Sequence, residues 1–241
     1  MTTRQNPARN TAAEIPFPLP KVQSNEKRRA RRLLAALEQH YPDAACALTY
    51  TSPHELLIAT ILSAQCTDVA VNKATPALFE RFPHPTDYAA SSAAEIEPYV
   101  HSLGFFRNKS KAIHSAMTNI VERFDSRVPR TMDDLLSLQG VARKTANVVL
   151  GNAFAVNVGF VVDTHIQRLS RRLCLVDDGL CVQLIERKLM ALFPRTRWTA
   201  LSHMLIHHGR NACSARAKHC ADHPICKGFG RCCERPRTHQ S

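Results

Sequence analysis

Helical patterns run along most of this chain, and only one segment looks like a strand. From Asn25 onward, apolar residues recur at helical spacing, as in Leu33, Leu34 and Leu37. Five prolines lie between successive helical segments or at their starts, where a missing amide hydrogen does least harm: Pro83, Pro85, Pro98, Pro129 and Pro194. Residues 158–162 are rich in β-branched residues, but five residues without a partner strand make no sheet. The sequence therefore predicts an all-α fold.

Charge and composition narrow the class of partner. The 241 residues contain 32 Lys and Arg against 20 Asp and Glu, a net charge of +12, which favours nucleic acid over a membrane surface. No apolar run approaches the roughly 20 residues that span a bilayer, and the N-terminus lacks the apolar stretch of a secretory signal. We expect a monomer in the cytoplasm, associated with the nucleoid, or in the nucleus of a eukaryotic cell. Residues 1–24, rich in Pro, Thr and Asn, predict a disordered tail.

Lys144 and Asp163 flank the one strand-like run. Lys144 lies near the start of a predicted helix, where the macrodipole disfavours a cation and favours the neutral, nucleophilic amine. Asp163 precedes Thr-His-Ile-Gln-Arg-Leu, the pattern of a helix N-cap. On this segment alone, a solvated surface lysine and a capping aspartate are the simpler interpretations.

A short turn built on Gly140 precedes Lys144. Between two helical segments, the apolar-Gly-apolar-small pattern should expose successive backbone amides beside a helix N-terminus. Such an arrangement binds phosphate without side-chain charge. The candidate phosphate-binding residues are Leu138, Gln139, Gly140, Val141, Ala142 and Arg143.

Cysteines gather near the C-terminus. Cys213, Cys220, Cys226 and Cys232 follow the spacing C-x6-C-x5-C-x5-C, with Cys233 next to the last. Four thiolates so close in sequence can surround one inorganic centre, so nine cysteines in an intracellular chain indicate a metal or cluster rather than disulfides. Cys233 could replace Cys232, or His223 with three cysteines could hold zinc. For His203, His207 and His208, at helical spacing, partly buried helix residues are favoured over metal ligands.

Three segments together resemble one family. LQGVARKTANVVL followed by VDTHIQRL, LLIATILSAQCTDVAVNKAT at 56–75 and LGFFRNKSKAI at 103–113 are similar to the endonuclease III family of DNA glycosylases. The resemblance implies two helical domains flanking a DNA-binding cleft. A helical barrel with the helix-hairpin-helix motif would span 52–157. Residues 25–51 and 158–235 would form the domain that bears the cluster loop, and 236–241 a second tail.

The resemblance also implies residue roles. Lys144 would be the nucleophile and Asp163 its catalytic partner, while Gln65 would fill the space left by an extruded base. Phe105 would be a second, apolar wedge, with plain core packing as its rival, and His165 would orient Asp163 or contact a phosphate. The implied function is base-excision repair of double-stranded damaged DNA. The enzyme would remove oxidised pyrimidines and nick the abasic site by β-elimination through a lysine Schiff base.

Departures from the family pattern leave alternatives open. The family's [4Fe–4S] cluster is held by C-x6-C-x2-C-x5-C, so the spacing here suggests a three-residue insertion that keeps the four cysteines as ligands. Gln139 and Ala142 replace the proline and second glycine of the usual Leu-Pro-Gly-Val-Gly, and Ala142 is expected to weaken DNA binding. The alternatives are a damaged-DNA or abasic-site binding protein with little or no glycosylase activity and a zinc-dependent DNA-binding protein. Lys144 argues against an adenine glycosylase of this fold.

Overall fold

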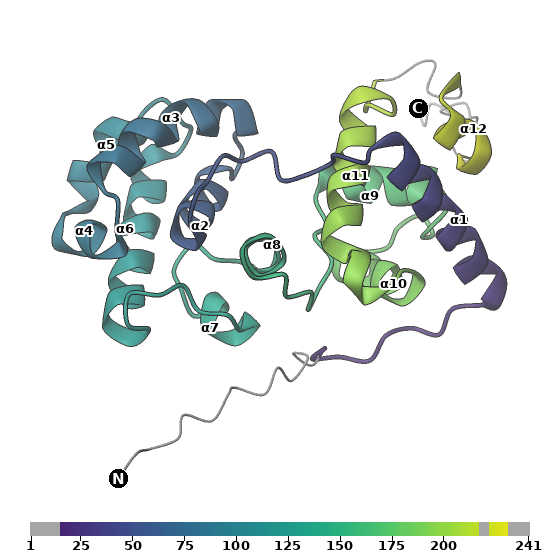
Figure 1. Ribbon diagram of the computed structural model, residues 1–241, viewed down its shortest axis with the longest axis horizontal. Helices are drawn as coiled ribbons and strands as arrows, with labels where there is room; N and C mark the ends of the chain where they lie inside the picture. Colours follow the sequence, from purple (N-terminus) through teal and green to yellow (C-terminus); the bar gives the residue numbers. More distant parts are fainter. Residues whose placement is uncertain (1–14, 217–221, 231–241) are drawn as a thin grey trace, which may run out of the picture.

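The computed structural model describes residues 15–216 and 222–230. Within these ranges every regular element is a helix, as the sequence predicts. Two groups of helices lie side by side, with α8 seen end-on between them (Figure 1). None of these helices is long and apolar enough to cross a membrane.

The first group of helices surrounds a core made of residues between Leu48 and Val158. Its centre is α2, whose seven buried residues Leu56–Leu62 leave no polar face toward solvent. Ser52 caps α2 by accepting a hydrogen bond from the amide of Glu55, and Pro53 occupies the first turn, where no amide hydrogen is needed. The helices of this group are α2 (Pro53–Leu62), α3 (Asp68–Arg81), α4 (Pro85–Ala90), α5 (Ala93–Val100), α6 (Phe106–Arg123), α7 (Met132–Leu136) and α8 (Arg143–Phe154).

The second group combines both ends of the described chain. Leu33, Leu34 and Leu37 of α1 pack with apolar residues that follow Val158, so the N-terminal helix completes a C-terminal core. Trp198, 2% exposed, lies in this core and donates its indole N–H to the Phe193 carbonyl. The helices are α1 (Ser24–His40), α9 (Thr164–Arg172), α10 (Val182–Leu192), the 3-10 turn η1 (Arg195–Arg197), α11 (Trp198–Asn211) and α12 (Pro224–Phe229).

Residues 15–23, expected to be part of a disordered tail, are instead packed against the protein. Ile15, Phe17, Leu19 and Val22 contact the second core. The guanidinium groups of Arg143 and Arg187 lie 5.0 Å and 4.4 Å from the centre of the Phe17 ring. These apolar and cation–π contacts offset the polar composition that suggested disorder. The extended segment runs from α1 back beneath α10 (Figure 1).

Candidate active site and metal centre

A cleft between the two cores brings Lys144 and Asp163 to one cavity. Lys144 comes from α8 of the first core, and Asp163 lies immediately before α9 of the second. The cavity is narrow, with a volume of about 100 Å³. Its lining residues from the first part of the chain are Ala45, Cys46, Ala47, Leu48, Thr60, Ser63 and Asp68. The others are Lys144, Val148, Asn152, Val161, Asp163, Thr199, Ser202, His203, Ile206, His207 and Arg210.

The start of α8 leaves Lys144 exposed and its neighbouring amides free. Ala142, the N-cap residue, has no side chain that can accept a hydrogen bond from the first turn. Leu138 and Val141 are 2% and 7% exposed, so their side chains anchor the turn rather than meet a ligand. Among the described residues, the amides of Gly140 and Ala142 have no hydrogen-bond acceptor. The helix therefore presents unpaired donors beside Lys144.

Gly140 is required by the backbone of this turn, whereas Ala142 fits it without strain. Gly140 has φ +79°, and a Cβ at this position would lie 2.8 Å from Cβ of Ala112. Ala142 has φ −90° and ψ 169°, an extended conformation open to any residue. The conformational reason for expecting Ala142 to weaken the turn therefore does not hold.

Asp163 caps α9 and faces the cavity at the same time. Its Oδ1 accepts a hydrogen bond of 2.8 Å from the amide of Ile166, so the capping geometry suggested by the sequence is present. Among the described residues, the second carboxylate oxygen has no hydrogen-bond partner. The cap thus fixes the orientation of a carboxylate that shares the cavity with Lys144.

Gln65 and Phe105 line a second recess, next to Gly140. All three residues have left-handed backbone, with φ of 56°, 59° and 79°. For a glutamine and a phenylalanine this conformation is unfavourable, and such strain concentrates at functional sites. The Phe105 side chain is 63% exposed, so plain core packing, the rival interpretation, does not describe it.

The side chains of Arg143 and His165 both have partners within the protein. The Arg143 guanidinium is held by the buried Glu186 carboxylate and by Phe17, so it points into the protein rather than toward a phosphate. Arg168 donates to Nδ1 of His165 at 3.3 Å, which leaves Nε2 of His165 to carry the proton. In the described part of the chain, no hydrogen bond joins His165 to Asp163.

Several cavity residues carry no motif in the sequence. Arg210 of α11 bonds Asp68 of α3 at 2.6 Å, and this ion pair bridges the two cores at the cleft. Nε2 of His203 and Oδ1 of Asn152 lie 2.7 Å apart, which joins α11 to α8. Helical periodicity placed these residues on helices, but only the packing of the two cores brings them together.

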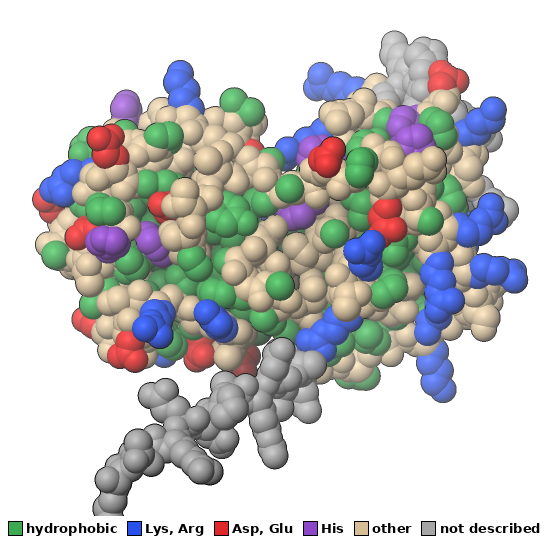
Figure 2. All heavy atoms as spheres, in the orientation of Figure 1, with side chains coloured by type: hydrophobic (Ala, Val, Ile, Leu, Met, Phe, Trp, Pro, Cys, Tyr) green, Lys and Arg blue, Asp and Glu red, His purple; other side chains and the backbone are tan. Residues whose placement is uncertain are grey.

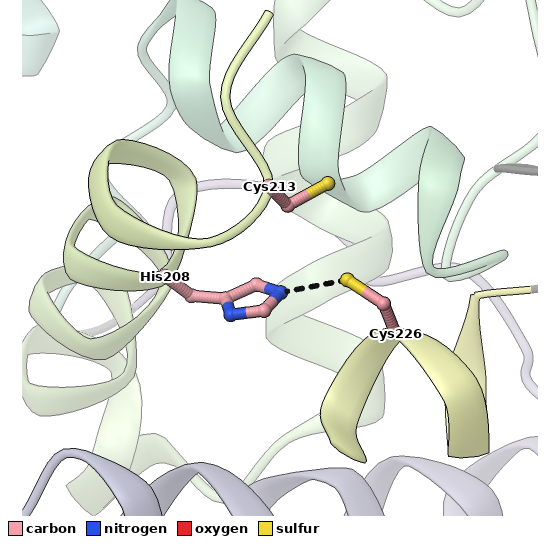
Figure 3. A group of neighbouring side chains, drawn as sticks. All are labelled: His208, Cys213 and Cys226. Atoms are coloured by element: carbon pink, nitrogen blue, oxygen red, sulfur yellow. Dashed lines mark hydrogen bonds between the residues drawn. The ribbon is translucent and has the colours of Figure 1, made fainter. Parts of the chain in front are cut away.

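A separate group of buried ligand-type atoms lies between α11 and α12. Cys213, Cys226 and His208 are 0%, 2% and 0% exposed, and their ligand atoms lie within 4.8 Å of one another. Figure 3 shows the three side chains converging, with His208 Nε2 3.3 Å from Cys226 Sγ. Burial, followed by His223 and His40, lowers the pKa of His208 to about 4. A neutral imidazole and two thiols make a donor set that suits a metal.

Two of the four predicted cysteine ligands thus lie together, while Cys220 and Cys232 fall outside the described residues. Arg172 donates to Cys213 Sγ at 3.2 Å, which would offset the negative charge of a ligand thiolate. The ring of His223, the rival zinc ligand, lies 4.9 Å from the ring of His208, but both of its nitrogens face other groups, Nε2 lying 3.4 Å from the Tyr41 hydroxyl. Its Nδ1 accepts from the amide of Ile225 at 3.3 Å and its ring stacks on Tyr41. His208, treated in the sequence as a partly buried helix residue, takes the place near the sulfurs.

Positive charge is spread unevenly over the surface. Lys and Arg gather on the second group of helices, which contains α1 and α9–α12. The outline of the molecule dips between the two groups of helices (Figure 2). On α1, Lys27, Arg28, Arg31 and Arg32 are exposed. An excess of cations on one part of the surface is the electrostatic signature of a polyanion-binding protein.

Two helical cores sharing a cleft, with a hairpin-helix lysine and a capping aspartate at one cavity, define a helix-hairpin-helix protein of the base-excision DNA repair class. Residues 58–195 match the HhH-GPD superfamily base excision DNA repair protein. The chain is 51% identical to endonuclease III of Synechocystis sp. over 83% of its length and 90% of that protein. It is 41% identical to endonuclease III of Bacillus subtilis over 77% and 84%.

Solved structures agree with these relatives. An endonuclease III trapped as a covalent intermediate with DNA superposes with a TM-score of 0.80 at 40% identity, covering 85% of this chain and 95% of the other. The same values hold for a non-covalent endonuclease III–DNA complex. This chain belongs to the endonuclease III family of DNA glycosylases and abasic-site lyases.

Proposed function

We propose that this protein removes oxidised pyrimidines from double-stranded DNA and nicks the resulting abasic site, with Lys144 as nucleophile and Asp163 as its partner. The observation that carries the proposal is the shared cavity. An exposed lysine from one core and an aspartate with one free carboxylate oxygen from the other line the same recess. That is the arrangement of a nucleophile beside a group that can take its proton.

The reaction follows from these two groups. Lys144 Nζ, as the free amine, attacks C1′ of the sugar while the bond from C1′ to the base breaks. The base leaves with the bonding electrons and takes up a proton, and Asp163 accepts a proton from the lysine nitrogen or stabilises the positive charge that develops on the sugar. Opening of the sugar ring gives the imine. Loss of a C2′ proton then expels the 3′ phosphate and nicks the strand.

The duplex would be gripped through the turn before Lys144. The free amides around Gly140 suit a phosphate, and Gln65 and Phe105, at the neighbouring recess, would enter the stack after the damaged nucleotide leaves it. Damage lowers the few kcal/mol needed to unstack a base. We propose that a monomer does this work on chromosomal DNA at the nucleoid. The guanidinium of Arg143 is already paired with Glu186, so Arg143 would take part in this grip through its backbone.

The two cores would correspond to a barrel domain, 52–157, and a second domain from 25–51 and 158–235. We propose that the second holds a [4Fe–4S] cluster through Cys213, Cys220, Cys226 and Cys232. The buried, converging sulfurs of Cys213 and Cys226 support a thiolate-bound centre, and Arg172 supplies compensating charge. Such a cluster would stabilise the domain without touching the bond that breaks.

Borohydride trapping tests the catalytic assignment. Duplexes with an abasic site or with an oxidised pyrimidine are incubated with the protein and reduced. The wild type should form a covalent complex on both, and Lys144→Ala on neither. Lys73→Ala, a matched change of an exposed lysine on α3, should trap like the wild type. If the wild type binds these duplexes but traps on neither, the protein is a damaged-DNA binding protein without lyase activity.

A further inference from the structure

Neighbouring side chains fix which nitrogen of the His203 ring, in the active-site cavity, donates a hydrogen bond. The Asn152 side chain donates through Nδ2 to the Val148 carbonyl at 2.7 Å, which leaves Oδ1 as the acceptor. Nε2 of His203 lies 2.7 Å from that oxygen. Because an amide oxygen only accepts, Nε2 of His203 must carry the proton.

The other nitrogen of His203 therefore keeps a lone pair. Nδ1 has no hydrogen-bond partner among the described residues, and it is not among the side-chain atoms sealed from solvent. Burial, followed by the charge of His207, lowers the pKa of His203 to about 4. The ring stays neutral at physiological pH, so Nδ1 of this cavity-lining histidine keeps its lone pair as an acceptor.

Most other polar side chains of the cavity are already engaged. The Ser63 hydroxyl donates to the Thr60 carbonyl at 2.8 Å, and Thr199 donates to Asn157 at 2.6 Å. Asp68 is paired with Arg210. Apolar lining comes from Leu48, Val148, Val161 and Ile206. An acceptor in such surroundings discriminates strongly between ligands with and without a matching donor, because an unpaired buried polar group is unfavourable.

We propose that His203 is a specificity-determining residue, whose Nδ1 accepts a hydrogen bond from the N3–H of the everted pyrimidine. The assignment rests on the proposed function and adds the chemical class that the cavity takes: a six-membered imide base that still carries N3–H. Asn152 is the positioning residue, because its amide fixes the tautomer and the rotation of the His203 ring. A base lacking this donor would leave Nδ1 unpaired.

Paired substrates and variants test this assignment. The duplexes carry 5,6-dihydrothymine, N3-methyl-5,6-dihydrothymine or a preformed abasic site. The proteins are the wild type, His203→Leu and His114→Leu. His114 is a matched control. It is a partly buried histidine of α6 that bonds the Ser91 carbonyl, and it does not line the cavity. Single-turnover rates of base excision and of abasic-site nicking are measured for each pair.

In the wild type, N3-methylation should slow excision about tenfold, the effect of one lost hydrogen bond. His203→Leu should excise dihydrothymine about tenfold more slowly, lower the ratio of excision to abasic-site nicking by the same factor, and lose nearly all sensitivity to N3-methylation. His114→Leu should keep the wild-type ratio and sensitivity. Because the N3-methyl comparison is made within each protein, a general loss of folding does not reproduce this pattern.

Two results would overturn the assignment while leaving the repair function in place. One is an N3-methyl effect in His203→Leu equal to that in the wild type. The other is an equal loss of excision and of abasic-site nicking, which indicates a purely structural residue. If the wild type acts on none of the three duplexes, the proposed function fails, and the role of His203 fails with it.

Discussion

Arg143 and Glu186 form a two-pronged ion pair that joins α8 of the first core to α10 of the second. Arg143 donates from Nε to Oε2 at 2.9 Å and from Nη2 to Oε1 at 2.9 Å. The same carboxylate accepts from Asn147 Nδ2 and from the Phe160 amide, each at 3.2 Å. Since Arg143 immediately precedes Lys144, this network sets how the hairpin helix meets the second core.

Glu186→Gln should therefore destabilise the protein by about 2 kcal/mol, because it leaves a partly buried guanidinium without its counter-charge. The measurement is the free energy of unfolding from urea titration. Glu26→Gln is the matched control, since the Glu26–Lys188 pair lies nearer the surface and should contribute less than about 1 kcal/mol. Equal losses in both variants would contradict a structural role for the Arg143–Glu186 pair.

Gly140→Ala should weaken DNA binding and lower stability by about 1 kcal/mol or more. The added Cβ meets Ala112, and φ of +79° strains any L side chain. Ala142→Gly, two residues along, should change stability by less than about 1 kcal/mol, because its φ is already −90°. Equilibrium binding to an abasic-site duplex and thermal unfolding report the two effects. Equal changes in DNA affinity and in unfolding temperature for the two variants would contradict a specific requirement for glycine at position 140.

Cys213→Ser and Cys226→Ser should each lose bound metal and lower the unfolding temperature. Both sulfurs are buried in the second core. Loss of the bound metal therefore removes the link that it would form between α11 and α12 in that core. The wild-type protein should be brown, and chemical analysis should find iron together with acid-labile sulfide in it. Cys181→Ser, an exposed cysteine, should retain wild-type metal content. A colourless wild-type protein that contains zinc would contradict the cluster and indicate a mononuclear zinc site.

His203 should make stability fall as the solution becomes acidic. Its pKa of about 4 in the native protein lies below the ordinary 6.5, so the unfolded chain binds the proton more tightly. The contribution is complete above about pH 6.5 and is lost as pH falls toward 4. Between pH 7 and pH 4.5 the wild type should lose about 2 kcal/mol more than His203→Leu. Parallel pH curves for the two proteins would rule out a buried neutral imidazole.

The sequence anticipated the parts of the site that depend on neighbours along the chain. The capping aspartate, the glycine turn and the helix that starts before Lys144 are local features, set by φ, ψ and amide pairing within a few residues. Packing of residues 15–23 was missed, because their polar composition hid four apolar residues that meet a surface built from distant helices. His208 is the buried helix residue that the sequence favoured, but its approach to Cys226 could not be predicted, since the spacing of three histidines on a helix does not indicate which ring reaches a distant sulfur.

By itself the sequence determined an all-helical chain, its basic charge, the turn that presents Lys144 and the cysteines that gather near the C-terminus. Those properties follow from periodicity, capping and spacing, which are short-range. Only the tertiary structure decided that Lys144 shares a cavity with Asp163, that Arg143 turns inward to Glu186, and that His203 lines the same cavity. These arrangements depend on how the two cores pack. The hydrophobic effect that drives this packing is non-directional, so the local sequence pattern does not specify which distant residues meet.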